Sequence, residues 1–160
     1  MIRLLLLATA IRLVIGCGTI DCNDQTYTCV GDDRPATLEY VTETILRPYC
    51  ATAGCHSAFA FRGNPNTGSH YRFDTVDHAR QSILTPNADD PMGVPAVDTV
   101  GFDPDSSLLY SVLVRPTGPN GELPRMPYDE PLQTSEIALI RRWISSPVDG
   151  GAGLDGLGAP

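Results

Sequence analysis

Two cysteines and a histidine form the closest group of reactive side chains in the sequence. Cys50 and Cys55 are separated by four residues, and His56 directly follows the second cysteine. A Cys-His pair with another cysteine upstream is typical of covalent haem c attachment, although two residues more commonly separate the cysteines. In that chemistry each thiol forms a thioether with a vinyl group, and the imidazole binds the iron. The pattern therefore predicts one haem c, held by Cys50, Cys55 and His56.

The residues between the two cysteines must accommodate the longer spacing. They are Ala51-Thr52-Ala53-Gly54, and all four are small. Gly54 would give the backbone the freedom to bulge outward. We therefore expect a loop that does not collide with a porphyrin.

A haem iron that transfers electrons usually has a second protein ligand, and methionine opposite histidine raises its potential. Met126 is the preferred candidate, because it precedes the last predicted helix and Pro127 stiffens its backbone. Met92, in the segment Asp90-Pro91-Met92-Gly93, is the competing candidate. An iron without this ligand would be open to small molecules, which would favour peroxidase-like reactivity over electron transfer.

One predicted helix leads directly into the first cysteine. Its apolar residues recur with helical spacing, and Thr37 is positioned to cap its start. Pro48 should end the helix near Arg47. These apolar residues are Leu38, Val41, Ile45 and Leu46.

Three further helices are predicted downstream. The first is capped by Asp74 or Thr75 and runs through Leu84, after a short extended piece at residues 71–73. The second opens at residues 103–106, buries Leu108, Leu109, Val112 and Leu113, and is followed by Pro116. The third runs from the capping pattern at residues 134–136 to about Ser145 and buries Ile137, Ile140, Trp143 and Ile144. Residues 57–70, 85–101 and 117–132 are predicted loops. An all-α domain with loops of this length is expected where chain wraps around a flat cofactor.

The amino-terminal residues have the character of an export signal. A short apolar run follows Arg3 and ends in Val14-Ile15-Gly16-Cys17, which is similar to the cleavage and lipidation site of bacterial lipoproteins. Residues 1–16 would be removed, and a lipid on Cys17 would anchor the protein to a membrane. The location expected is the periplasm or the outer membrane of a Gram-negative bacterium. The alternative is an ordinary secretory signal with Cys17 kept as a thiol.

The rest of the chain divides into three parts. Residues 17–35 are polar and acidic and are predicted to be a tether, in which Cys22 and Cys29 could close a disulfide. Residues 36–146 hold the predicted helices and form the domain. Residues 147–160 are rich in glycine and are predicted to be a mobile tail.

Charge limits the kind of partner. The chain has 11 basic residues, none of them lysine, against 19 acidic ones, and a formal net charge of −8. A chain this acidic is not expected to bind nucleic acid through phosphate contacts. A redox partner should be neutral or basic where the two proteins meet. The sequence does not identify that partner.

The order of these pieces resembles the cytochrome-c-like domains of bacterial secreted proteins, including the planctomycete-type cytochrome c family. The pieces are residues 45–56, 106–110, 126–127 and 136–144, within a resemblance that covers about residues 37–146. The resemblance implies a class I cytochrome c fold of three to four short helices around a haem. It also implies thioethers at Cys50 and Cys55, His56 as proximal ligand and Met126 as distal ligand, in an electron carrier rather than an enzyme.

Two alternatives do not involve haem. Cys50 and Cys55 could form a disulfide in a haem-free lipoprotein that acts as a structural or binding module. The same residues with His56 could bind zinc together with His70 or His78, although the side chains of adjacent residues do not easily converge on one ion. No arrangement of Ser, His and Asp, or of paired carboxylates, suggests hydrolytic catalysis.

Overall fold

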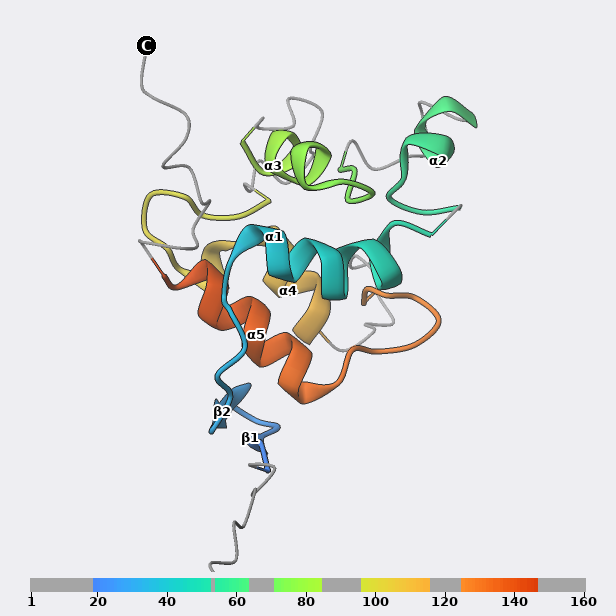
Figure 1. Ribbon diagram of the computed structural model, residues 1–160. Coiled ribbons are helices and arrows are strands. Elements are labelled where there is room, and N and C mark those ends of the chain that lie inside the picture. The colour runs from blue at the N-terminus through green and yellow to red at the C-terminus, as the bar shows by residue number, and fades with distance from the viewer. Residues whose placement is uncertain (1–18, 53, 64–70, 85–95, 116–124, 147–160) are drawn as a thin grey trace, which may run out of the picture.

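The computed structural model describes residues 19–52, 54–63, 71–84, 96–115 and 125–146. This part of the chain is largely helical, as predicted, but it also contains a small sheet that the all-α prediction did not include (Figure 1). The elements, in chain order, are β1 (Asp21–Asn23), β2 (Thr28–Val30), α1 (Leu38–Val41), η1 (Thr42–Cys50), α2 (Ala58–Gly63), α3 (Val76–Leu84), η2 (Pro104–Ser106), α4 (Leu108–Val114) and α5 (Thr134–Ile144). No helix in the described segments is both long and apolar enough to cross a membrane.

The carboxy-terminal helix α5 lies at the centre of the fold. Figure 1 shows it between α1 and the β1–β2 hairpin, and it also contacts α4. The predicted buried residues are indeed buried, and Ala138 and Leu139 are buried with them because neighbours cover more than one side of the helix. Gln133, rather than a residue of the predicted 134–136 pattern, is the N-cap, and its N–H donates to Glu136 Oε2 (2.9 Å).

The helix that leads into the first cysteine begins as predicted but ends later. Thr37 Oγ1 accepts the Tyr40 N–H (3.2 Å), and the four predicted apolar residues are at most 1% exposed. The expected end near Arg47 is wrong, because the chain continues past Pro48 to Cys50 in π-helical winding. This wider winding carries the chain past a residue that has no N–H, and Ala51 N–H still donates to Leu46 O (3.0 Å).

The helix α3, which follows α2 in the chain, agrees with its prediction at both ends. Thr75 Oγ1 accepts the His78 N–H (3.1 Å) and so caps the first turn. Ala79 and Ile83 are buried against the central cluster of apolar side chains, and α3 packs on α1 and η1. Figure 1 therefore shows a stack in which α3, α1 with η1, α5 and the hairpin follow one another.

The helix predicted to open at residues 103–106 is instead divided in two. Ser107, which separates η2 from α4, has an extended backbone (φ −99°, ψ 126°) and is buried. Its hydroxyl donates to Asp103 O (2.9 Å) and accepts the Asp98 N–H (2.9 Å). These bonds give the backbone an alternative to helical hydrogen bonding, so a helix begins again only at Leu108.

One predicted loop contains a helix. Ser57 Oγ accepts the Ala60 N–H (3.2 Å) and starts α2 within the segment expected to be irregular. Residues 125–132 are irregular, as predicted. The loop predictions for residues 64–70, 85–95 and 117–124, the tail and the signal segment lie outside the described residues.

The segment predicted to be an acidic tether is docked on the domain over residues 19–34. β1 and β2 pair antiparallel with Cys22 opposite Cys29, and a disulfide joins these two cysteines, with Cα atoms 4.1 Å apart. Arg142 on α5 donates to the carbonyl oxygens of Asp32 and Arg34. Apolar periodicity, on which the tether prediction is based, does not reveal these polar contacts.

Candidate functional site

The predicted site residues lie where η1 ends and the chain turns toward α2. Cys50 is the last residue of η1, and its carbonyl oxygen accepts the His56 N–H (2.9 Å). Cys55 N–H donates to Thr52 O (3.0 Å). The backbone thus folds back on itself and brings His56 to the end of the helix. The expected role of Gly54 is not needed, because its φ lies outside the left-handed region and a Cβ there would meet no atom within 4 Å.

The two thiols of this turn have different environments and are not bonded to each other. Cys50 is only 8% exposed, whereas Cys55 is exposed. Burial raises the pKa of the Cys50 thiol to about 12, and negative charge on Cys55 adds to this effect. Cys50 therefore stays protonated in the folded chain, and Cys55 is the thiol that solvent reaches.

A backbone carbonyl determines the tautomer of His56. His56 Nδ1 lies 3.2 Å from Tyr71 O. A carbonyl oxygen only accepts hydrogen bonds, so Nδ1 carries the hydrogen and the lone pair of the neutral ring is on Nε2. Burial lowers the pKa of His56, and the Tyr71 carbonyl opposes this in part. The neutral ring is the form that binds metal ions.

The segment that holds His56 is part of the site that sequence reasoning missed. Phe73 N–H donates to His56 O (2.8 Å), and the Phe73 ring lies 5.4 Å from the imidazole, between centroids. Ser82 on α3 holds the same segment, because its hydroxyl accepts the Arg72 N–H (2.8 Å) and donates to Arg72 O (3.2 Å). The alternation Tyr71-Arg72-Phe73 was the available signal, but it indicated only an extended piece.

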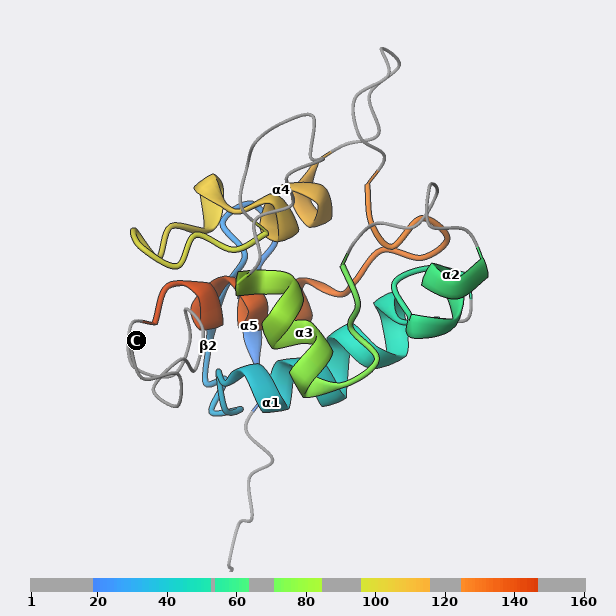
Figure 2. The ribbon, with the colours of Figure 1, turned by 90° about the horizontal axis from the view of Figure 1, so that it is seen from above.

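The loop that carries Met126 reaches the same end of the molecule. In Figures 1 and 2 the orange segment at residues 125–133 passes beside the end of η1. In agreement, the carboxylates of Glu136 and, more weakly, Glu130 raise the pKa of Tyr49, which directly precedes Cys50. Met126 itself is half-buried, and its N–H donates to Val112 O (2.8 Å). The competing ligand Met92 lies outside the described residues.

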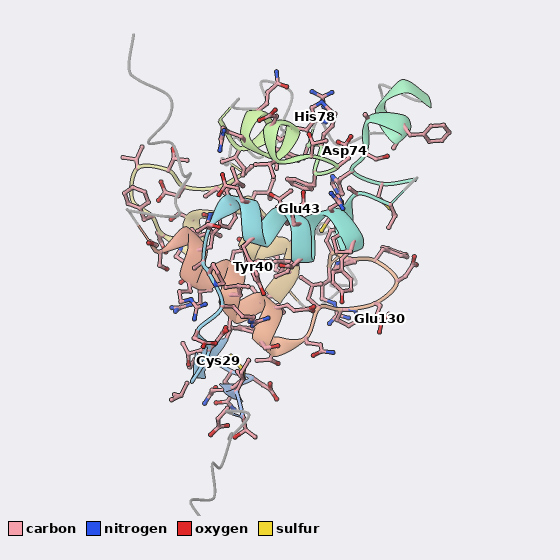
Figure 3. All side chains as sticks on the ribbon, in the orientation of Figure 1. Cys29, Tyr40, Glu43, Asp74, His78 and Glu130 are labelled. Atoms are coloured by element: carbon pink, nitrogen blue, oxygen red, sulfur yellow. A yellow bond between two sulfur atoms is a disulfide. The ribbon has the colours of Figure 1, made fainter. Side chains whose placement is uncertain are left out.

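The histidines of the zinc alternative are not part of this turn in the described structure. His78 is on α3, where its Nδ1 lies 2.9 Å from Asp74 Oδ1, and Figure 3 shows the two together. His70 and Cys17 lie outside the described residues. Within the part of the chain that the structure describes, no group of three or more Cys, His, Asp or Glu side chains is arranged to hold a metal ion.

Three aromatic side chains near this site are unusually exposed. Tyr49 is 42% exposed, Phe59 75% and Tyr128 76%. Each lies within three residues of Cys50, His56 or Met126. Contiguous exposed apolar surface marks places that bind something, whereas single exposed side chains such as Val30 (78%) and Val100 (87%) are ordinary. The site therefore offers two unbonded thiols, a neutral imidazole with its lone pair on Nε2, and aromatic surface in adjacent segments.

These groups define what the site can do chemically. Thiols can form covalent bonds to carbon, and an imidazole nitrogen can bind a transition-metal ion. Comparison of the chain with protein-family models, with curated proteins and with solved structures gave no match.

Proposed function

We propose that this chain is a c-type cytochrome, which carries one haem c covalently and transfers electrons. Cys50 and Cys55 would hold the group through thioethers, and His56 would be the proximal ligand of the iron. The hydrogen bond between His56 Nδ1 and Tyr71 O carries this proposal. Histidines that bind metals almost always donate the other ring N–H to a carbonyl, a carboxylate or water, which fixes the ring and its tautomer.

The protein residues have separate tasks in this proposal. Cys50 and Cys55 would each hold the group through a C–S bond, and because the S–H hydrogen would go to the other vinyl carbon, no oxidant would be needed. The Tyr71 carbonyl orients His56 and keeps its Nε2 unprotonated. The group itself would supply one-electron chemistry at its iron.

A second axial ligand would come from Met126. Its loop passes beside the end of η1, and the Val112 carbonyl holds the Met126 backbone. A thioether ligand raises the potential of a haem iron and suits it to electron transfer. In the proposed class I cytochrome c fold, His56 and Met126 would together hold the iron.

The exposed aromatic residues support an apolar ligand at this end. Tyr49, Phe59 and Tyr128 expose ring surface that a porphyrin would cover, and covering it would be favourable. The two thiols also remain available because they are not joined in a disulfide. The haem-free alternative does not account for the position of these aromatic residues.

The sequence also indicates the location and the partner expected of such a cytochrome. A lipid on Cys17 would anchor it in the periplasm or to the outer membrane. Its acidic surface would favour a redox partner that is neutral or basic at the contact, and it would not bind nucleic acid.

The test of this function is covalent haem. The protein is produced in a host that attaches haem c, then denatured and assayed for haem by its pyridine haemochrome spectrum. We expect the haem to remain bound to the denatured chain. Cys50→Ser with Cys55→Ser should abolish it, whereas the control Cys22→Ser with Cys29→Ser should retain it. A colourless wild-type protein with a Cys50–Cys55 disulfide would instead support the haem-free lipoprotein.

A second test concerns the distal ligand. Met126→Ala should lower the reduction potential measured by redox titration, because the variant loses the thioether ligand that favours ferrous iron. Met92→Ala should leave the potential unchanged. The opposite result would move the assignment to Met92. If the wild type is already five-coordinate, the peroxidase-like alternative becomes the better function.

A further inference from the structure

A hollow of about 270 Å³ lies away from the cysteine–histidine turn. It is bounded by the β1–β2 hairpin, the end of α4, the loop at residues 125–132 and the start of α5. Arg115 and Arg125 are both in its wall, and Asp24 and Thr134 lie there too. Neither cysteine of the turn lines it, nor do His56 and Met126.

The two arginines of the hollow differ from the others in the described structure. Six other arginine side chains have partners there: Arg34 with Asp32, Arg47 with Glu43, Arg72 with Gln81, Arg80 with Glu39, Arg141 with Tyr110 and Arg142 with Asp32. Within the described residues, neither Arg115 nor Arg125 has a side-chain hydrogen bond or an ion pair. Both residues are only partly exposed, and in a chain with 19 acidic residues neither has an acidic partner among the described residues, which favours an anion as the ligand of the hollow.

The remaining charge of the wall limits the charge of a ligand. Asp24 is the acidic residue among the described residues that line the hollow, and its Oδ1 accepts a hydrogen bond from the Thr134 hydroxyl. Over these described residues, two arginines and one aspartate leave one net positive charge. A ligand with a single negative charge would neutralise the hollow, whereas a multiply charged anion would be repelled by Asp24.

The rest of the wall is apolar. Leu113, Leu132 and Ile137 are 3%, 7% and 5% exposed and form part of it. Tyr27 also lines the hollow, with its ring edge-on to Tyr110 at 6.3 Å between centroids. The backbone of Tyr27 is in the left-handed region (φ 49°), which is uncommon for an aromatic residue. The ligand therefore needs an apolar body as well as a charge.

We infer that this hollow binds a small monocarboxylate that carries an aromatic or branched apolar group. Guanidinium groups match carboxylates in shape and can bind both oxygens at once. The volume corresponds to about nine water molecules, which suits a molecule of the size of benzoate. This inference does not depend on the proposed haem, because the two sites share no side chain.

The test uses the full chain with benzoate and with benzamide, which has the same ring and no charge. Binding is followed by calorimetric titration. We expect benzoate to bind at millimolar or lower concentration and benzamide to bind at least about tenfold more weakly, since a charge-assisted contact is lost. Arg115→Gln and Arg125→Gln should each weaken benzoate binding by about tenfold or more.

Arg47→Gln is the matched control, because it removes the same charge from an exposed arginine outside the hollow. It should leave benzoate binding within about twofold of the wild type. Circular dichroism should show that all three variants fold. The inference is overturned if the wild type does not bind benzoate, or if it binds benzamide equally well. It is also overturned if Arg47→Gln weakens binding as much as the two other variants do.

Discussion

The described fold contains two pairs of cysteines in separate places, and only one pair forms a disulfide. Cys22 and Cys29 face each other across the hairpin and form a disulfide. Cys50 and Cys55 are closer in sequence, yet they remain separate thiols, one buried and one exposed. Figure 3 shows Cys29 at the hairpin, far from the end of η1.

The difference shows that backbone geometry, rather than spacing, decides whether two thiols meet. In the hairpin, paired positions of antiparallel strands direct their side chains to the same side of the sheet. At the end of η1, one cysteine faces the core and the other follows a turn, so the fold itself does not join them. The first pair therefore contributes to stability, and the second pair is the one that the proposed function uses.

The largest loss of stability is expected from Asp32→Asn. The Asp32 carboxylate is 1% exposed and binds Arg34 at two points (2.8 and 2.9 Å), so the variant leaves the Arg34 guanidinium without its negatively charged partner. We expect the free energy of unfolding to fall by about 3 kcal/mol. Urea denaturation measures this loss.

Glu43→Gln is the matched control for that change. Its ion pair with Arg47 is close (2.6 Å), but both side chains are about half exposed. Solvent screens such a pair, so we expect a loss of at most about 0.5 kcal/mol. Equal losses in the two variants would mean that burial does not strengthen the ion pair between Asp32 and Arg34.

The double change Cys22→Ser with Cys29→Ser should have the next largest effect. The disulfide closes a short loop, with a sequence separation of 7, and its loss should lower the free energy of unfolding by about 2.5 kcal/mol. Differential scanning calorimetry would report the lower melting temperature. No loss of stability would show that the contacts of the hairpin with α5 are enough to hold it.

Lowering the pH should gradually remove the contribution that the Asp32 carboxylate makes to the free energy of unfolding. The Arg34 hydrogen bonds hold the pKa of Asp32 below its ordinary value in the folded chain, while the unfolded value is near 4. The unfolded state therefore binds the proton first, and the stability that Asp32 provides is complete above about pH 4 and is lost as pH falls through the lowered folded value. The difference in unfolding free energy between wild type and Asp32→Asn should shrink over that range. A difference that does not change with pH would contradict this origin.

The smallest effect is a difference between the modification rates of Cys50 and Cys55, and it involves no change in the free energy of unfolding. In protein made without haem, iodoacetamide should modify Cys55 at least about ten times faster than Cys50, because Cys50 is buried and its pKa is about 12. Peptide mass spectrometry reads the two rates. Equal rates would contradict the difference in burial, and no modification at either residue would indicate a disulfide between them.

Helices that begin at a polar cap and continue with regular apolar spacing were predictable from the sequence. The caps at Thr37 and Thr75 and the buried side of α5 are the clearest cases. Local exceptions were not predictable, because they depend on hydrogen bonds that residue type does not reveal. Pro48 is passed by π-helical winding, and the Ser107 hydroxyl interrupts a helix.

The candidate site was predictable only in its side chains. Cysteine and histidine are visible as residue types, whereas the group that fixes His56 is the backbone carbonyl of Tyr71, 15 residues away. The hairpin was missed for a similar reason, since its docking depends on contacts with a helix more than a hundred residues later. The arginines of the hollow come from two segments that only the fold brings together.

The contacts of Arg142 have a consequence for how the chain is made. Synthesis proceeds from the amino terminus, so the hairpin leaves the ribosome 110 residues before the helix to which it binds. Until that helix is made, the hairpin has no surface on which to dock, and contacts this distant in sequence form slowly. Docking of the hairpin therefore requires that nearly the whole described domain has been made, and it joins the earliest part of that domain to the latest.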